Sequence, residues 1–492
     1  MAKTNPARGM RDFLPIDVRK REYVIGIIKQ VYESYGYEPL ETPAVENIDT
    51  LMGKYGEEGN QLIFKILKRG EKLKDELTKF RELTESRNSA NSVHSPNSLS
   101  DLALRYDLTV PLARVVADRR NELPKFFKRY QIQPVWRADR PARGRFREFY
   151  QCDVDAIGSA SMTVESEMMS AVSEIFSRLR RNVEAANLDD FVILVNHRDV
   201  LLGFAEAFKI ASDKLNDAFV VIDKADKIGP EGVLNELVDK NILSQQGAHN
   251  MVMELFSSIG EARETPETRS PLEKLEDENQ EELDRLEGII GQTERGRAGL
   301  KAIREFLALS KELQSYGHIR VQSSLARGLS YYTGAIFEVG LNRLDFKGSI
   351  GGGGRYDGLI GMFGKEQIPA CGFSLGLERI LVVMDERGMF PPEIAESRAA
   401  DVMVTIWSEE TIPESLKFAD ALRKQGLRVL VYPEADKLGK QLKYADTIRV
   451  PFVCILGPDE LEKGVAKLKD MQTSEETTGP AIEISPVIAR SR

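Results

Sequence analysis

Arginine is concentrated in one short segment of this chain. Five arginines fall within eleven positions, namely Arg137, Arg140, Arg143, Arg145 and Arg147. A guanidinium group donates paired hydrogen bonds to phosphate or carboxylate oxygens, so this density needs an anionic partner or open solvent. The arginines alternate with aromatic and apolar residues, which fits a solvated loop poorly. Charge counting alone leaves both interpretations open, a phosphate site and a solvated loop.

A second arginine stands in a segment that also carries two tyrosines. Between Leu325 and Gly334, Arg327 lies beside a glycine and precedes Tyr331 and Tyr332. Adjacent residues of a strand point to opposite faces, so one tyrosine suffices to line a pocket. A hairpin with core aromatic residues is the alternative interpretation.

Two glycine-containing segments follow. Gly351–Gly354 is a run of four glycines, which permits close approach of the backbone to a ligand. Its spacing is not that of a dinucleotide fingerprint. Gly372–Arg379 is typical of a strand entering a helix, and it places Arg379 in the first turns of that helix. Both a surface position and a site position remain open for Arg379.

The surrounding elements follow from hydrophobic periodicity. Residues 16–35 have a helical period and are followed by Gly36, a residue typical of a helix stop. Residues 126–136 and 146–154 alternate around a Gly/Pro loop, which predicts an antiparallel hairpin with a basic tip. We expect its neighbours in the sheet to be Phe191–Val195, Ala335–Val339 and the turn-rich Gly351–Gly354.

A chain of 492 residues is too long for one hydrophobic core, so several domains are expected. The predicted fold class is α+β, a body built on an antiparallel sheet with a helical insertion and a C-terminal α/β domain with a largely parallel sheet. The predicted boundaries are 1–196 for the first part of the body, 197–316 for the insertion, 317–390 for the second part, 391–400 for a linker and 401–492 for the C-terminal domain.

Composition narrows the class of protein. The net charge of −9 argues against nonspecific coating of nucleic acid, although residues 101–150 hold twelve basic and six acidic side chains. Three distant cysteines and four unpaired histidines show no metal-ligand spacing, so we predict no metal site formed by the protein. Without a membrane span or a secretory signal, a cytoplasmic location is expected. The Ser/Asn-rich segment 88–98 suggests a surface loop without assigned chemistry.

In combination these motifs resemble a known family. The hairpin ending at Arg137, with its basic loop and the Arg147 to Phe149 segment, resembles the second signature of class II aminoacyl-tRNA synthetases. Gly372–Arg379 resembles their third signature, and Gly36–Pro43 is similar to the looser first one. The segments Leu104–Thr109, Arg327–Gly334 and Gly351–Asp357 resemble signatures of the histidine-specific branch, the histidyl-tRNA synthetases. The resemblance covers nearly the whole chain.

This resemblance implies roles in the activation of L-histidine by ATP. Arg137 and Arg327 would hold the α-phosphate from opposite sides, and Arg379 would meet the far phosphates. Asp139 and Phe149 would hold the adenine by hydrogen bonding and stacking. In such a displacement the protein acts mainly by positioning the substrates and by placing cations where charge develops. The family also uses Mg²⁺ on the pyrophosphate portion.

The resemblance also implies the binding of the other two substrates. Asp107, Thr109 and Gln151 would bind the α-ammonium group of histidine, and Asp155, Tyr331 and Tyr332 its imidazole. Arg140, Arg143 and Arg145 would approach the acceptor end of tRNA(His), with the helical insertion as a clamp over the acceptor arm. The C-terminal domain, with thirteen basic and fifteen acidic residues from 400 onward, would bind the anticodon through splayed bases more than through bulk charge. Members of this family are homodimers.

One position departs from the family pattern. Ser330 stands between Leu329 and Tyr331, where members commonly carry aspartate. If that carboxylate orients Arg327 or a tyrosine, its loss predicts a reduced rate before a loss of specificity. Two alternatives therefore remain: a synthetase-like regulatory subunit of the phosphoribosyltransferase of histidine biosynthesis, and a pseudo-enzyme that binds tRNA without activating an amino acid. The candidate C-terminal domain and the three arginines Arg137, Arg327 and Arg379 favour the enzyme.

Overall fold

The chain divides into two compact units, Met1–Pro391 and Pro392–Arg492. The computed structural model describes residues 4–85, 99–180, 191–257, 270–328, 332–341, 348–364, 366–395 and 398–489. The division falls at the start of the predicted linker 391–400, whereas the predicted insertion 197–316 is part of the first unit. The other predicted boundaries remain predictions. Within the described ranges, no helix has the length and apolar character needed to cross a membrane.

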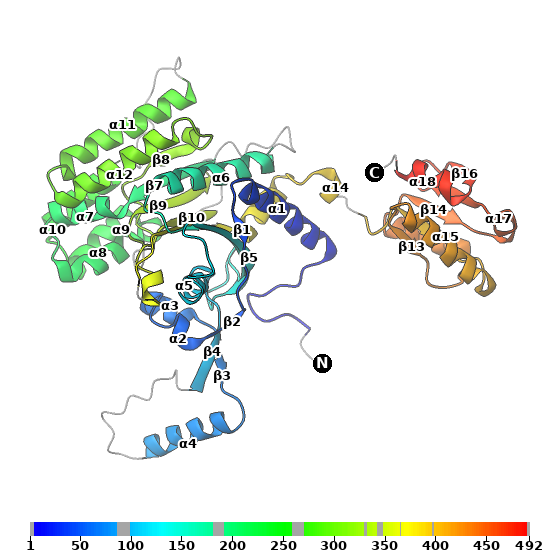
Figure 1. Cartoon of the computed structure of the whole chain (residues 1–492), viewed down its shortest axis with the longest axis horizontal. Coiled ribbons are helices and arrows are strands. Elements are labelled where there is room, and N and C mark those ends of the chain that lie inside the picture. The colour runs from blue at the N-terminus through cyan, green and yellow to red at the C-terminus, as the bar shows by residue number, and fades with distance from the viewer. Residues whose placement is uncertain are drawn as a thin grey trace. The chain divides into compact units, whose positions relative to one another are not determined.

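An eight-stranded sheet forms the centre of the first unit, in the order β1-β5-β6-β11-β10-β9-β7-β8 (Figure 1). Its strands are β1 (Glu38–Pro39), β5 (Phe127–Trp136), β6 (Glu148–Ile157), β7 (Phe191–His197), β8 (Ile319–Val321), β9 (Ala335–Leu341), β10 (Gly351–Arg355) and β11 (Ala370–Gly376). The six central strands pair antiparallel, and the edge strands β1 and β8 pair parallel with their neighbours. The predicted antiparallel body is confirmed.

The predicted hairpin is the pair β5–β6, which closes at Trp136 opposite Glu148 and leaves the arginine-rich loop at its tip. The glycine run was expected to be turn-rich, and this was wrong, because Gly351–Arg355 is the interior strand β10. The reason is close packing between strands. A Cβ on Gly353 would lie 2.2 Å from the carbonyl oxygen of Gly372, so the neighbouring strand leaves no room for a side chain.

Helices cover one face of this sheet. They are α1 (Pro15–Ser34), α6 (Thr163–Arg180) and α13 (Leu377–Glu386), and they pack on one another and on the central strands. Their side of β6 is apolar, with Cys152 and Val154 fully buried. As predicted, α1 ends before Gly36, whose φ of 75° suits glycine. The opposite face of β6, away from these helices, carries polar residues.

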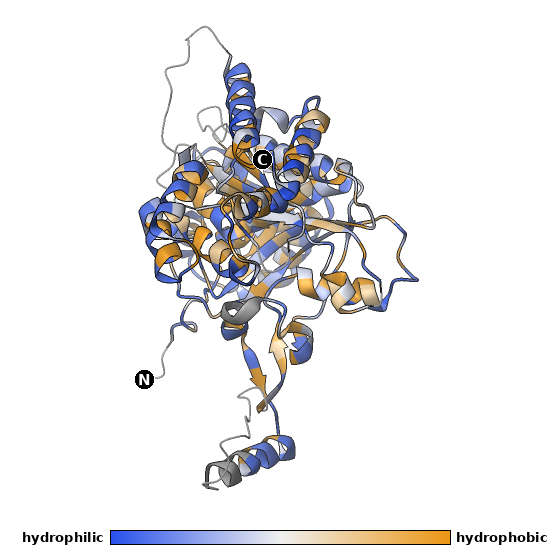
Figure 2. Ribbon diagram, turned by 90° about the vertical axis from the view of Figure 1, so that its left-hand side faces the viewer, coloured by the Kyte–Doolittle hydropathy of each residue, from blue (hydrophilic) through white to orange (hydrophobic). Residues whose placement is uncertain are grey.

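The remaining elements of the first unit flank the sheet. A three-stranded sheet, β2-β4-β3, joins β2 (Val45–Asn47), β3 (Lys65–Leu67) and β4 (Ser100–Leu104), accompanied by α2 (Ile48–Leu51), α3 (Gly56–Leu62), α4 (Glu71–Glu85) and α5 (Thr109–Asp118). The segment between β7 and β8 is helical, as predicted, with α7 (Arg198–Ala207), α8 (Leu215–Ile222), α9 (Ala225–Asp239), α10 (Gln245–Phe256), α11 (Pro271–Ile290) and α12 (Glu294–Ser310). Figure 2 shows hydrophobic and hydrophilic residues on different sides of its helices.

The second unit is a separate α/β domain. Its sheet has the order β13-β12-β14-β15-β16, from β12 (Val402–Val404), β13 (Val429–Val431), β14 (Phe452–Ile455), β15 (Ala466–Asp470) and β16 (Glu476–Gly479). Its helices are α14 (Pro392–Ala395), α15 (Ile412–Lys424), α16 (Leu438–Thr447), α17 (Pro458–Glu462) and α18 (Ala481–Ala489). The first three strands of the sheet are parallel, as expected, and β15 and β16 extend it as an antiparallel hairpin.

A buried ion pair fixes the end of β10 to α6. Arg355 Nε lies 2.6 Å from Glu165 Oε1, and its Nη2 lies 2.8 Å from Oε2. The Glu165 side chain is fully buried, and that of Arg355 is 8% exposed. Arg355 also donates to the carbonyl of Ser159 at 2.9 Å. The two charges compensate each other away from water, so each depends on its partner.

We therefore expect Glu165→Leu to destabilise the first unit by about 3–5 kcal/mol, because it leaves the Arg355 guanidinium buried and unpaired. Chemical denaturation followed by circular dichroism measures this change. Glu278→Gln is the matched control, since it breaks an exposed pair with Arg320 at 2.9 Å and should change stability by at most about 1 kcal/mol. Equal effects of the two substitutions would contradict a structural role for the buried pair.

Candidate active site

Three polar residues of β6 point to the face of the sheet opposite the helices α1, α6 and α13. Gln151, Asp153 and Asp155 alternate along the strand and therefore point to the same side. Their partners in β11 are small: Gly376, Ser374 and Gly372. A Cβ on Gly372 would lie 2.0 Å from Asp155 Oδ1, so only glycine leaves room for that carboxylate. The small residues of β11 thus leave room for the polar side chains of β6.

Asp155 is held by two buried partners. Arg129 Nη2 lies 2.7 Å from Asp155 Oδ2, and the two side chains are 0% and 3% exposed. The Tyr356 hydroxyl donates a short hydrogen bond to Asp155 Oδ1. Burial raises the pKa of the Asp155 carboxyl, while the Arg129 charge and the Tyr356 hydroxyl act in the opposite direction. These contacts fix the orientation of the carboxylate.

Asp153 and Gln151 offer acceptors without partners. Among the described residues, Asp153 Oδ1 and Gln151 Oε1 are buried and have no hydrogen-bond partner. The Gln151 amide is oriented by Ser374, whose Oγ accepts from Nε2 at 3.1 Å. Burial raises the pKa of the Asp153 carboxyl to about 7, opposed by Arg129. Buried acceptors of this kind cost free energy unless a donor fills them, which favours a cationic ligand group.

Asp107 approaches the same place from the start of α5. Its Oδ1 accepts from the Tyr55 hydroxyl at 3.0 Å and from the Val110 N–H at 3.0 Å. Burial raises the pKa of its carboxyl, while the Val110 N–H, Arg137 and Tyr55 oppose that shift. Thr109 is the first residue of α5. The helix start therefore positions two more polar side chains.

These groups surround one cavity of about 120 Å³. Six of the residues predicted from the sequence line it, namely Asp107, Thr109, Arg137, Gln151, Asp155 and Tyr332. Asp153, Tyr356 and Ser374 line it as well. Tyr331 and Ser330 lie outside the described residues, so their predicted effects stay predictions.

Arg137 lies between two aromatic rings. Its guanidinium carbon is 4.3 Å from the centroid of Tyr106 and 5.3 Å from that of Phe149. Its Nε donates to the Tyr106 carbonyl at 3.0 Å. The rings restrict the side chain, so the charge is held at the wall of the cavity. Phe149 therefore positions Arg137 in addition to the stacking role predicted for it.

Arg327 and Arg379 form a positive cluster away from this cavity. Arg327 Nε lies 2.6 Å from Glu338 Oε2, and its Nη1 lies 3.7 Å from Asp223 Oδ1. Burial lowers the pKa of the Arg379 guanidinium, Arg145 and Arg327 lower it further, and Glu338 opposes them. Arg379 Nη1 also donates to the carbonyl of Ser349. Guanidinium groups gathered in this way form a site suited to several anionic oxygens.

The loop at the tip of the β5–β6 hairpin carries the remaining predicted residues. Asp139 is buried and pairs with Arg145, whose Nη2 lies 2.9 Å from Oδ1. Arg143 pairs with Glu386 of α13, and Arg140 is exposed. Two of the three arginines predicted to contact tRNA are thus engaged with carboxylates. The third, Arg140, presents its charge at the surface.

Sequence reasoning missed several residues of the site. Asp153 could have been found, because it stands between Gln151 and Asp155 on the same face of a strand. Arg129, Tyr356 and Glu338 come from separate strands or from the end of one, and no local spacing connects them to Asp155 or Arg327. Their roles depend on the sheet order.

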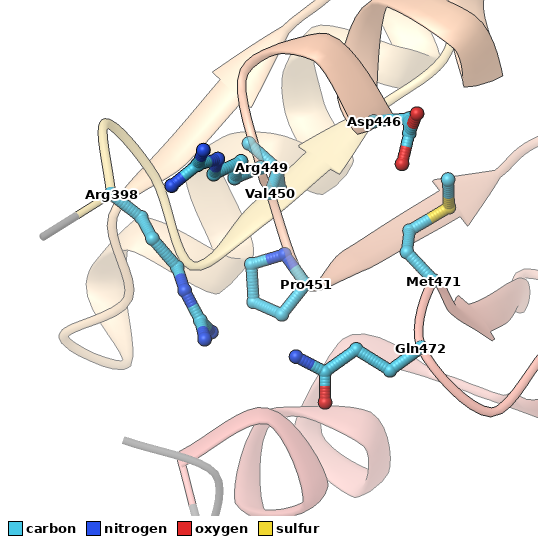
Figure 3. Close-up of a pocket in the computed structure, with 7 residues that line it drawn as sticks. All are labelled: Arg398, Asp446, Arg449, Val450, Pro451, Met471 and Gln472. Carbon is cyan, nitrogen blue, oxygen red and sulfur yellow. The ribbon is translucent and has the colours of Figure 1, made fainter. Parts of the chain in front are cut away.

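The second unit has a cavity of its own, of about 290 Å³. Figure 3 shows Arg398, Arg449 and Gln472 around it, with Asp446 and Met471 on the far wall. Arg398 precedes β12, and Arg449 precedes β14. Two guanidinium groups and an amide therefore gather at the edge where these parallel strands begin.

Comparison with known proteins identifies the family. The family model described as histidyl-tRNA synthetase matches residues 9–74 and 80–380, and an anticodon binding domain model matches residues 401–490. The chain belongs to the histidyl-tRNA synthetase family. A histidine–tRNA ligase of Porphyromonas gingivalis is 42% identical over 98% of both chains, and one of Christiangramia forsetii is 39% identical over 96% of this chain and 97% of its own.

Solved structures agree with this assignment. The crystal structure of histidyl-tRNA synthetase from Nostoc sp. PCC 7120 matches with a TM-score of 0.73 at 29% identity and covers 100% of both chains. The predicted class II fold and the predicted histidyl-tRNA synthetase family are confirmed. Because the curated relatives are named as ligases over nearly the full chain, they support the enzyme over the regulatory-subunit alternative.

The buried Asp153 predicts a defined dependence of stability on pH. Its pKa of about 7 in the folded chain exceeds the ordinary value of 3.8. Between these two values the folded state binds the extra proton, so stability falls as pH rises through this window. We expect Asp153→Asn to remove this loss. The free energy of unfolding of the variant, relative to that of the wild type, should therefore increase from pH 4 to 7 and then level off.

Denaturant midpoints measured at several pH values test this dependence. The exposed substitution Asp213→Asn is the control and should follow the wild-type profile. A constant difference between the Asp153→Asn and wild-type profiles would show that Asp153 does not titrate in this window.

Proposed function

We propose that this member of the family activates L-histidine with ATP and transfers it to tRNA(His), with histidine in the cavity between β6, β11 and α5. The observation that carries the proposal is the convergence of carboxylates with Arg137 around that single cavity. An amino acid carries both charges, an ammonium group and a carboxylate. The cavity offers acceptors for the first and a guanidinium for the second.

The proposed histidine contacts use the polar side chains that line the cavity. Asp107, Thr109 and Gln151 bind the α-ammonium group, and Asp153 adds the buried carboxylate that sequence reasoning overlooked. Asp155 and Tyr332, with Tyr331 beside it, bind the imidazole. A carboxylate has about four lone-pair positions, so Asp155 retains acceptor capacity beside Arg129 and Tyr356. A site built to hydrogen-bond a polar ring rejects apolar analogues strongly.

The proposed phosphate chemistry uses the arginines. The histidine carboxylate attacks the α-phosphorus of ATP, and pyrophosphate leaves. Arg137 and Arg327 stabilise the charge that develops on the α-phosphate, and Arg379 binds the far phosphates. Asp139 and Phe149 hold the adenine. Glu338 and Asp223 orient Arg327 by their ion pairs with it.

Mg²⁺ is proposed to arrive with ATP. Among the described residues, no group of three acidic, histidine or cysteine side chains could hold a metal ion. Mg²⁺ commonly keeps several waters and binds through substrate phosphates with one or two carboxylates. When bound, the ion neutralises charge on the leaving pyrophosphate.

For tRNA, we propose that Arg140, Arg143 and Arg145 contact the acceptor end and that the helical insertion clamps the acceptor arm. The second unit binds the anticodon. Its cavity supplies guanidinium planes and an amide for an unstacked base, which fits recognition of single-stranded loops. We also propose a homodimer acting in the cytoplasm, as the family resemblance implies. Light scattering of the purified chain tests the dimer.

Arg327→Ala tests the phosphate role. We expect histidine-dependent exchange of pyrophosphate into ATP to fall about 10²–10³-fold, because one preorganised cation is lost from the charge that develops on phosphate. Arg320→Ala, which removes a half-buried arginine of β8 that lines no part of the histidine cavity, should exchange at the wild-type rate. Full exchange by Arg327→Ala would remove this residue from the mechanism, and no exchange by the wild type would overturn the proposed function.

Removal of the second unit tests the anticodon role. A chain ending at Pro391 follows the division between the units and leaves the first unit intact. We expect pyrophosphate exchange to persist while charging of tRNA(His) falls about tenfold or more, since contacts to the unstacked bases are lost. Undiminished charging would show that the second unit does not bind the anticodon.

A further inference from the structure

The segment before α1 lies against the arginine-rich loop of the β5–β6 hairpin. Its residues 9–13, called here the N-terminal segment, belong to no helix or strand. The carbonyl of Gly9 accepts a hydrogen bond from the Arg147 N–H at 2.8 Å. A Cβ on Gly9 would lie 2.8 Å from Pro141 Cγ, and its φ of 83° also suits glycine. The segment therefore approaches the loop too closely for a side chain at this position.

Arg11 adds a second contact with the same loop. Its guanidinium carbon lies 3.4 Å from the ring centroid of Phe146 and 4.8 Å from that of Phe13. A planar guanidinium group stacks well on aromatic faces, which attract its charge. Arg11 Nη2 also lies 4.0 Å from Oε1 of Glu378, in the first turn of α13. One side chain thus joins the hairpin loop to the start of α13.

Glu378 is a buried carboxylate to which the proposed reaction gives no role. Its side chain is 4% exposed, and both of its oxygens accept from the Tyr150 N–H, at 3.1 and 3.2 Å. Burial raises the pKa of this carboxyl to about 7, while backbone N–H groups, Arg11 and Arg21 oppose that shift. The two guanidinium groups therefore favour the charged form, which accepts most strongly from Tyr150.

The hairpin residues assigned to ATP depend on Arg147. The Arg147 carbonyl accepts from the Arg137 N–H at 2.9 Å, and its Nε donates to the carbonyl of Asp139 at 3.0 Å. The Arg147 N–H is the group that Gly9 binds. The N-terminal segment therefore reaches both ATP-binding residues of the loop through one intermediate residue.

The other two residues assigned to ATP lie beside the Glu378 contact. Phe149 precedes Tyr150 in β6, and Arg379 follows Glu378 in α13. The hydrogen bonds between Glu378 and Tyr150 therefore join the strand that carries Phe149 to the helix that carries Arg379. Arg11 lies at the same junction, on the side of the loop.

We infer that the N-terminal segment holds the ATP-binding residues in place, with Arg11 as the positioning residue that joins the hairpin loop to α13. The inference rests on the proposed function, because that proposal assigns ATP to these residues. Arg11 acts through Phe146 and Glu378 and lines no part of the histidine cavity. Its effect therefore falls on ATP and leaves histidine binding unchanged.

Three variants of the full chain test this inference. Arg11→Ala removes the guanidinium group from the two rings and from Glu378, whereas Arg11→Lys keeps the positive charge and loses the planar stacking surface. Gly9→Ala brings a Cβ against Pro141 and should push the segment away from the loop. Arg8→Ala is the matched control, since it removes an exposed arginine from the adjoining position.

Tryptophan fluorescence measures the binding of ATP directly. The chain has two tryptophans, Trp136 and Trp407, and Trp136 is the last residue of β5. In a Trp407→Phe background the signal therefore reports on the base of the hairpin loop. We expect the Kd for ATP to rise about tenfold in Arg11→Ala and Gly9→Ala, because the binding groups lose their fixed positions. Arg11→Lys should show a smaller rise, and Arg8→Ala should stay within about twofold of the wild type.

Pyrophosphate exchange supplies a second readout. In Arg11→Ala and Gly9→Ala the KM for ATP should rise by about the same factor as the Kd. The KM for L-histidine should stay within about twofold of the wild type, because the histidine cavity is unaltered. A role limited to stability would instead change both constants together and would lower the denaturation midpoint measured by circular dichroism.

The outcomes separate this inference from the proposed function. Unchanged ATP binding in both Arg11→Ala and Gly9→Ala would overturn the inference. So would equal rises in the two KM values, or a loss confined to the transfer to tRNA(His), because the segment would then support the whole fold or the tRNA site. Absence of exchange in the wild type would instead overturn the proposed function, and the fluorescence titration, which needs no exchange, tests the inference independently.

Discussion

The buried pair of Arg129 and Asp155 constrains the rest of the catalytic body. Two opposite charges 2.7 Å apart lie in a sheet interior with almost no exposure. Removal of either partner would leave a charge in a low dielectric, which is far more costly than keeping both. The neighbouring residues therefore fit this pair closely. Glycine at position 372 leaves room for the Asp155 carboxylate, and the Tyr356 hydroxyl donates to its Oδ1. The fixed carboxylate then becomes one wall of a cavity.

On the face of the sheet opposite α1, α6 and α13, acidic and basic side chains gather in different regions. The polar side chains of β6 and of the start of α5 gather in one region, where a cation is favoured. Arg145, Arg327 and Glu338 gather near Arg379 in another region. Arg137 lines the histidine cavity, held by Tyr106 and Phe149. The arrangement matches a reaction that joins an amino acid to a nucleotide phosphate. No side chain needs to act as a nucleophile, since the substrate carboxylate supplies the attacking oxygen.

The sequence predicted what local patterns encode. Alternation predicted β5 and β6, a helical period with Gly36 predicted α1, and the strand-to-helix pattern placed Arg379 in the first turn of α13. The turn predicted at the glycine run was wrong. Glycine is required there because the neighbouring strands pack too closely to leave room for a side chain. Glu338 and Asp223 were not predicted as partners of Arg327, because these contacts depend on how β9 and the insertion pack against the segment that carries Arg327.

The central claim is that the buried Asp153 carboxylate of β6, together with Asp107, binds the ammonium group of histidine. Calorimetric titration of L-histidine at pH 7, in buffers of different ionisation enthalpy, tests it most directly. Burial raises the pKa of the Asp153 carboxyl to about 7, so binding of a cation beside it should release protons to the buffer. The account predicts this release in the wild type and its loss in Asp153→Asn. Equal proton release in both proteins, or none in the wild type, would contradict it.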